Sequence, residues 1–223
     1  QLSGNINEDD GVWSASAKNL DMGKVIQLLP KEFIPSSRDL YLDGNLDLNI
    51  NAISNFSGTS INAKGNWTNG YLNINDSYFI ADNMNTQIIY SNGKLNSFET
   101  SLLRFEDISL ESRGSKFQGN LSLENFKQPK CKADIKFDSQ WMDLMHWLEY
   151  KTWEGSKGKL FGEIYWNNDF KNIDELKKKV FWGGKWKGNL LIPDADLEIE
   201  GANQTTQLSN LNIEFDDYNL NII

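Results

Sequence analysis

The chain has 223 residues, of which 39% are apolar, with 12 Phe, 8 Trp and 7 Tyr, a composition that allows a buried core and favours strands. Because 31 acidic residues outnumber 22 basic ones and the net charge is −9, binding to nucleic acid, which requires clustered cations, is not expected. The single cysteine, Cys131, excludes an intramolecular disulfide and a thiolate metal site.

Alternation of apolar and polar residues predicts strands along most of the chain. In the run 40–50 the even positions are Leu, Gly or Ile and most odd positions are polar, as in a strand with one dry face. The same alternation recurs at Leu72/Ile74, Ile108/Leu110, Phe117/Leu121/Leu123, Ala133/Ile135/Phe137, Leu160/Ile164/Trp166, Leu190/Ile192, Leu197/Ile199 and Leu211/Ile213/Phe215. Turn signals at Asn69-Gly70, Asn92-Gly93, Arg113-Gly114 and Glu200-Gly201 predict an antiparallel meander.

Three segments have helical spacing instead, at residues 21–29, 138–150 and 173–180. Asp21 is expected to cap the first segment, and Pro30 lies just past its end. Asp138 or Ser139 is expected to cap the second.

Strand and helix motifs recur at an offset of about 118 residues, which indicates a repeat. Leu42-x-Gly44-x-Leu46 matches Leu160-x-Gly162-x-Ile164, and the segment after Trp67 matches the segment after Trp186. We therefore expect residues 1–19 to end one repeat, 20–136 to form a complete helix-plus-meander repeat and 137–223 to begin the next, without a flexible linker. The chain begins and ends inside apparent strands, so it is expected to come from a longer protein.

Residues that could carry catalysis are few. His146 is the only histidine, so a nucleophilic triad or a His-rich metal site is not expected. Acidic pairs occur at Asp9-Asp10, Asp194/Asp196 and Asp216-Asp217, and their turn or alternating contexts favour turns and wet strand faces. The basic run 177–179 follows two acidic residues and is interpreted as a solvated face. We expect no enzyme activity, no metal and no cofactor.

The tryptophans leave two interpretations open. They could form a platform that stacks on sugars, or they could pack in a core or groove, which we favour. The residues concerned are Trp147, Trp153, Trp166, Trp182 and Trp186.

The order of the motifs resembles the AsmA-like family of Gram-negative envelope proteins. The resemblance lies in the helix that ends Val25-Ile26-Gln27-Leu28-Leu29-Pro30, the strand at 40–48, the strand pair at 61–65 and 70–74, and the run 115–126 that leads through Pro129 to the second helix. It covers nearly the whole chain, and the Asn- and Lys-rich composition is similar to that of Bacteroidetes members. It implies an elongated, curved antiparallel sheet, a half-pipe with an apolar inner face. It also implies a periplasmic location, an inner-membrane anchor outside this chain, and a role in phospholipid transport and outer-membrane biogenesis.

The leading hypothesis is therefore a segment that binds phospholipid or another acyl-chain ligand along an apolar groove. The candidate groove residues are Leu42, Leu46, Leu48, Leu72, Ile74, Ile108, Leu110, Leu121, Leu123, Ile135, Leu160, Ile164, Leu190 and Ile192. The same side chains could instead pack as a closed core. The alternatives are an assembly scaffold with envelope-protein partners at exposed strand edges, and the glycan-binding module.

Overall fold

The computed structural model describes residues 2–6, 11–27, 40–56, 58–74, 80–143, 157–179, 183–198, 205–217 and 219–222. In chain order the elements are β1 (Leu2–Ile6), β2 (Gly11–Asp21), α1 (Met22–Gln27), β3 (Leu40–Asn55), β4 (Gly58–Ile74), β5 (Ile80–Ser91), β6 (Leu102–Ser112), β7 (Ser115–Glu124), β8 (Lys130–Gln140), β9 (Lys157–Asp169), α3 (Ile173–Lys179), β10 (Lys185–Glu198), β11 (Thr205–Asp216) and β12 (Asn219–Ile222). The chain is mainly β with a few short helices, as the alternation predicts. No helix in the described ranges is long and apolar enough to cross a membrane.

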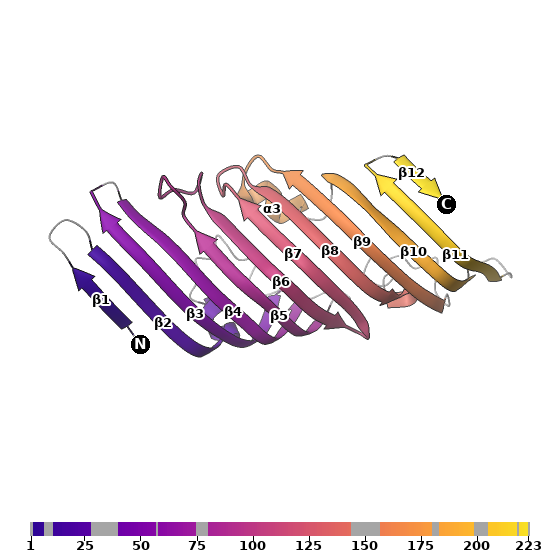
Figure 1. Ribbon diagram of the computed structural model, residues 1–223, viewed down its shortest axis with the longest axis horizontal. Coiled ribbons are helices and arrows are strands. Elements are labelled where there is room, and N and C mark those ends of the chain that lie inside the picture. The colour runs from indigo at the N-terminus through magenta and orange to yellow at the C-terminus, as the bar shows by residue number, and fades with distance from the viewer. Residues whose placement is uncertain are drawn as a thin grey trace.

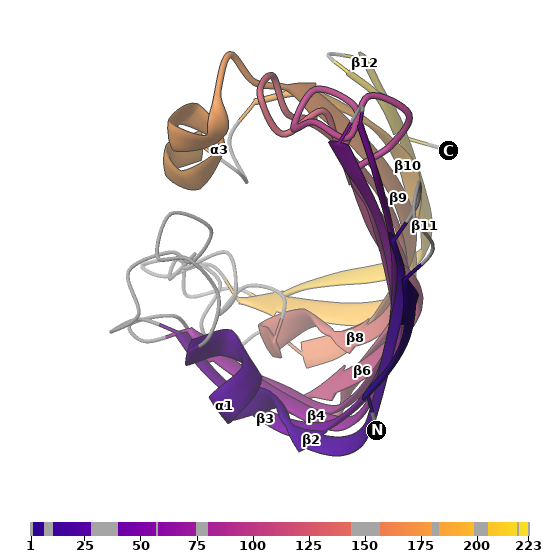
Figure 2. The ribbon, with the colours of Figure 1, turned by 90° about the vertical axis from the view of Figure 1, so that its left-hand side faces the viewer.

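The strands form one 12-stranded antiparallel sheet in which each strand lies beside its neighbours in the sequence. The sheet is open, with β1 at one edge and β12 at the other. The strands bend into an arc, and α1 and α3 lie on the concave side (Figures 1 and 2). We call the concave surface the inner face and the convex surface the outer face. The predicted curved antiparallel sheet is thus present.

A bulge in β4, opposite Gly44 of β3, keeps the apolar side chains on both sides of it on the inner face. Gly44 has φ 113°, and the β3–β4 register shifts between Asp43 and Asn45. The predicted turn at Asn69-Gly70 is wrong, because both residues lie inside β4. Asn69 does adopt a positive φ of 50°, but the extra residue is absorbed as a bulge next to Gly70 rather than reversing the chain.

Other turn predictions have mixed outcomes. Arg113 (φ 50°) and Gly114 (φ 90°) form the β6–β7 hairpin turn as expected, and Asn92-Gly93 begins the β5–β6 loop. Glu200-Gly201 lies outside the described residues. The run predicted around 190–192 and Leu197 belong to one strand, β10, whose pairing with β9 is irregular between Leu191 and Ala195. Ile199 lies outside the described residues.

Two of the three predicted helices are confirmed. Asp21 caps α1, since its Oδ1 accepts a hydrogen bond from the Lys24 amide at 3.2 Å. In α3, Asn172 Oδ1 accepts from the Glu175 amide at 2.9 Å, and Glu175 Oε2 accepts from the Lys171 amide at 2.8 Å. The first bond satisfies a free amide of the first helical turn, and the second ties the residue before the Asn172 cap to the helix.

The predicted second helix begins later than expected. Asp138 and Ser139 are not caps, because β8 continues to Gln140 and pairs with β9 along its whole length. The Ser139 side chain is buried and bonded to the Ser115 hydroxyl at 3.0 Å, which holds it in the sheet. A helical turn follows at residues 141–143, and the rest of the predicted helix, including His146, lies outside the described residues.

Three apolar clusters on the inner face make up the core. The first, beneath Met22 and Val25 of α1, contains Leu42, Leu46, Trp67 and Met84. The second contains Phe137, Leu160, Ile192 and Ala195, and the third, beneath Leu176 of α3, contains Cys131, Trp166 and Phe170. The core is therefore distributed along the sheet instead of lying at one centre.

The repeat of about 118 residues stays a prediction. A helix or helical turn connects β2 to β3 and again β8 to β9, which is the order that the repeat requires. Both predicted repeat boundaries fall inside strands of the same continuous sheet.

Candidate functional site

One row of residues crosses the inner face from β2 to β10 without a polar side chain. Each member is the cross-strand partner of the next, in the order Ala17, Leu48, Gly65, Ile88, Phe105, Leu121, Ala133, Trp166 and Trp186. With about 4.8 Å between neighbouring strands, the row extends for roughly 40 Å. We call it the apolar row. It runs across the strands, along the length of the half-pipe.

The middle of the inner face is less covered than its flanks. Leu121 on the apolar row is 37% exposed, and Ile135 on the adjacent strand β8 is 38% exposed. In contrast, Leu46 beneath α1 is 4% exposed and Trp166 in the cluster that Leu176 of α3 packs against is 7% exposed. The structure thus leaves apolar surface in contact with water between two covered regions.

The alternation along the strands places thirteen of the fourteen predicted groove residues on the inner face, where they fall into three groups. Leu42, Leu46, Leu160 and Ile192 are buried; Leu48, Leu72, Ile108, Leu110, Leu123, Ile164 and Leu190 are half-buried; Leu121 and Ile135 are exposed. Ile74 pairs with Leu40, and its side chain lies outside the described set. Many of the predicted residues are therefore core, and the exposed pair marks where the inner face is open.

The list of groove candidates omits several aromatic residues of the inner face. Phe117 stacks on Phe137 with ring centroids 6.0 Å apart, and Trp166 lies 5.8 Å from Trp186. Phe105 lies on the apolar row between Ile88 and Leu121. Phe117, Phe137 and Trp166 stand in the alternating runs found in the sequence, and Trp186 was expected in a core or groove. Phe105 was not identified, because a register shift separates it from Ile108 and hides its phase.

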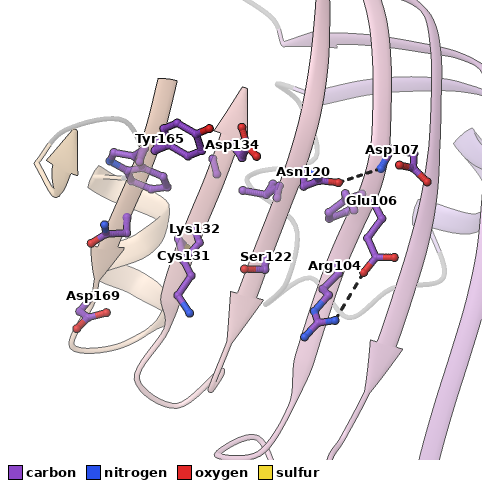
Figure 3. Close-up of a pocket in the computed structure, with 15 residues that line it drawn as sticks. Arg104, Glu106, Asp107, Asn120, Ser122, Cys131, Lys132, Asp134, Tyr165 and Asp169 are labelled. Atoms are coloured by element: carbon purple, nitrogen blue, oxygen red, sulfur yellow. Dashed lines mark hydrogen bonds and ion pairs between the residues drawn. The ribbon is translucent and has the colours of Figure 1, made fainter. Parts of the chain in front are cut away.

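A hollow of about 670 Å³ lies over the middle strands β6 to β9 (Figure 3). Its lining combines members of the apolar row with polar residues that alternate with them. They are Arg104, Phe105, Glu106, Asp107, Asn120, Leu121, Ser122, Cys131, Lys132, Ala133, Asp134, Tyr165, Trp166, Asn167 and Asp169. The hollow contains no histidine, and Arg104 and Glu106 in it form an ion pair at 3.6 Å. Because these polar residues alternate with the apolar row along each strand, their side chains lie on the outer face, so the hollow belongs to the outer face and not to the apolar row.

The outer face of β8 and β9 carries polar and charged side chains. Glu163 accepts hydrogen bonds from Tyr165 at 2.7 Å and from Lys136 at 2.9 Å, and these bonds lower the pKa of Glu163. The bond to Glu163 raises the pKa of Lys136 and of Tyr165. At neutral pH the Glu163 carboxylate and the Lys136 ammonium are therefore both charged, and contact with water is favourable for this part of the outer face.

The remaining candidate residues do not assemble a catalytic group within the described ranges. Asp217 Oδ1 accepts a hydrogen bond from the Trp186 amide at 3.1 Å, so this carboxylate holds the end of β11 against the start of β10. Asp194 and Asp196 lie on β10, and Asp9-Asp10 are outside the described residues. The basic run 177–179 lies at the end of α3, and its side chains are outside the described set. No group of three or more His, Cys, Asp or Glu residues in the described ranges could hold a metal ion.

Two of the five tryptophans proposed for sugar stacking can be placed. Trp166 is buried and donates from Nε1 to the Gly183 carbonyl at 3.0 Å, while Trp186 packs on it. These two belong to the packed inner face rather than to an exposed platform. Trp147, Trp153 and Trp182 lie outside the described residues.

Cys131 lies in the third cluster. Burial, with a further contribution from Asp169, raises the pKa of its thiol to about 11. The side chain is therefore a protonated, weakly reactive thiol at neutral pH.

Comparisons with protein-family models, curated proteins and solved structures found no match for this chain.

Proposed function

We propose that this chain is a non-catalytic segment that binds phospholipid, or another ligand with acyl chains, along the inner face of its curved sheet. The single observation that carries the proposal is the apolar row, which continues through nine strands and is exposed at Leu121. An acyl chain is long and apolar, so it needs a continuous apolar surface, and a row of apolar residues across the strands of a meander provides one.

The energetics of such a groove follow from burial. Each methylene that leaves water contributes about 0.8 kcal/mol, so a chain lying along the row is stabilised by contact with many side chains of modest size. The row is longer than one acyl chain, since it extends for roughly 40 Å. Lipids could therefore occupy successive positions and move along it while their headgroups remain in water.

The face of the sheet opposite the proposed groove is exposed to water, and ion pairs on its middle strands suit it to water. Lys136–Glu163 and Lys132–Glu124 are ion pairs on that face, at 2.9 and 3.6 Å. An acyl chain is therefore expected to bind the apolar inner face and not these charged strands of the outer face.

The wider setting is part of the same proposal. The resemblance to AsmA-like proteins supports a periplasmic location, an inner-membrane anchor outside this chain, helix-plus-meander repeats of about 118 residues, and a contribution to outer-membrane biogenesis. The sequential order of strands in one open sheet supports it, because such a sheet lengthens by adding repeats at either edge.

The test uses residues that are apolar, on the inner face and already exposed. Leu46 is unsuitable, because it is 4% exposed and an aspartate there would unfold the core. We therefore choose Leu121→Asp with Ile135→Asp. The matched control is Leu191→Asp, since Leu191 is 45% exposed but lies on the outer face of β10.

Protein purified without detergent is examined by native mass spectrometry and lipid extraction. We expect phospholipid with the unaltered chain and with the Leu191 variant, and its loss from the folded Leu121/Ile135 variant. A folded, unaltered chain that carries no lipid and takes up none from added phospholipid would overturn the proposal. The scaffold alternative, with protein partners at the β1 and β12 edges, would then be favoured.

A further inference from the structure

One corner of the sheet contains no charged residue. Lys, Arg, Asp and Glu are all absent from residues 11–17, 48–63 and 83–93. At the average of 24% charged residues, segments of this combined length would carry about eight. The residues that bound them in the sequence are Asp10, Lys18, Asp47, Lys64, Asp82 and Lys94.

These three segments are neighbours in space. Val12 of β2 pairs with Ile53 of β3, Ile53 pairs with Ser60 of β4, and Asn62 of β4 pairs with Ser91 of β5. They make up adjoining parts of the four consecutive strands β2, β3, β4 and β5, together with the β3–β4 turn. We call this region the uncharged corner. The β3–β4 turn and the β5–β6 loop lie along the same long edge of the sheet (Figure 1).

Exposed apolar side chains gather at the same place. Of the eleven large apolar side chains that are exposed in the described part of the chain, six lie in the uncharged corner or in the adjoining β5–β6 loop. They are Val12, Trp13, Ile53, Phe56, Leu95 and Phe98. Phe56, in the short β3–β4 turn, is 97% exposed and projects from the edge of the sheet.

The β5–β6 loop is held firmly against β4. Asn92 Oδ1 accepts from the Ile61 amide at 2.8 Å, and its Nδ2 donates to the Thr59 carbonyl at 2.7 Å. The Thr100 hydroxyl donates to the Asn92 carbonyl at 2.7 Å, which closes the loop. Leu95 and Phe98 are therefore presented by an ordered loop, and little further ordering is needed for them to bind.

We infer that the uncharged corner and the β5–β6 loop insert shallowly into the surface of a phospholipid bilayer. Protruding Phe and Leu side chains require a deformable apolar layer, and Trp13 suits the interface between headgroups and acyl chains. The corner itself carries no charge into that layer, which removes the largest penalty for entering it. In the loop, Lys94 and Glu99 flank Leu95 and Phe98, and they remain at headgroup level, where Glu99 pairs with Lys127. The uncharged polar side chains of the corner, such as Asn51 and Asn62, remain at headgroup level.

A second copy of the chain is a poorer partner for this corner. Phe56 and Phe98 would need a receiving pocket, and the hollow over β6 to β9 is lined by charged residues, among them Arg104, Lys132 and Asp134. Burying these charges against a phenyl ring would be unfavourable. The membrane is therefore the partner that fits the chemistry of this surface.

The test uses vesicles of phosphatidylcholine, which carry no net charge, and measures binding of the whole chain by flotation. Phe56→Ser and Phe98→Ser should each weaken partitioning by about tenfold, because each removes a large side chain from the apolar layer. Leu191→Ser, which changes an apolar residue that is 45% exposed and far from the corner, should leave binding unchanged. Brominated phosphatidylcholine should quench part of the tryptophan fluorescence, and Trp13→Phe should remove that quenched part.

Three results would overturn the inference. The first is that the folded chain fails to float with the vesicles. The second is that binding disappears in about 1 M NaCl, which screens charge-driven attachment and leaves apolar insertion in place. The third is that Phe56→Ser and Phe98→Ser bind as well as the unaltered chain. If the chain instead forms dimers that Phe56→Ser dissociates, the corner is a protein interface. Leu121→Asp with Ile135→Asp should keep vesicle binding, so failure of the inner-face proposal can be recognised separately.

Discussion

Truncating two leucines of the inner face tests whether its middle is open. Leu160 is 1% exposed within the second cluster, whereas Leu121 is 37% exposed on the apolar row. Leu→Ala at a fully buried site costs 2–5 kcal/mol, which combines lost transfer free energy with an unfilled cavity, and we expect about 3–4 kcal/mol for Leu160. Leu121 already contacts water, and a cavity there stays open to solvent, so we expect about 1 kcal/mol.

The free energy of unfolding would be measured by urea denaturation, followed by far-UV circular dichroism. Equal slopes for the unaltered chain and the two variants would allow the midpoints to be compared directly. Leu191→Ala serves as a control, because its side chain is 45% exposed on the outer face and its truncation should also cost about 1 kcal/mol or less.

The refuting result is a loss at Leu121 as large as that at Leu160. Such a loss would mean that the middle of the inner face is packed as tightly as the second cluster. The apolar row would then be a closed core, and the main support for an acyl-chain groove would be removed.

Three further predictions concern stability. Gly44→Ala should cost about 2–4 kcal/mol, because Gly44 has φ 113° and an added Cβ would lie 2.7 Å from Trp67 Nε1, while Gly114→Ala, at φ 90° with open space around it, should cost less in the same thermal or urea measurement. Asn92→Ala should destabilise the β5–β6 loop by about 2–4 kcal/mol, since two backbone groups of β4 lose their partners, and hydrogen exchange should be faster there and not across β9; unchanged exchange would contradict it. Because the pKa of Cys131 is raised to about 11, its thiol stays protonated in the folded chain while an unfolded thiol ionises near 8.5, so stability should fall as pH rises above about 8.5 and alkylation should be slow until the chain unfolds; rapid alkylation of the folded chain at pH 8 would contradict the burial.

Much of the local structure could be predicted from the sequence. Period-2 alternation identified most strands, because it reflects a single physical requirement, one dry and one wet face, that acts on each strand separately. The beginnings of α1 and α3 were also predictable, since capping by Asp21 and the helical spacing of 173–180 are local features. The predicted end of β8 was wrong, because the bond between Ser139 and Ser115 joins strands 24 residues apart and extends β8 beyond Asp138.

The candidate site was only partly predictable for the same reason. Alternation placed Leu46 and Leu121 on the same face but could not distinguish them, since α1 packs over the first and leaves the second exposed. Phe105 was missed because a register shift between β6 and β7 changes its phase relative to Ile108.

The sequence by itself determined that this is a meander of amphipathic strands with short helices, because those patterns depend on residues a few positions apart. Only the tertiary structure decided that Asn69-Gly70 is a bulge, that the inner-face residues join into a row across β2 to β10, and that the uncharged segments meet at one corner. These outcomes depend on the register between strands, which is set by pairing along each whole strand and by the helices that pack on it, and no short stretch of sequence contains that information.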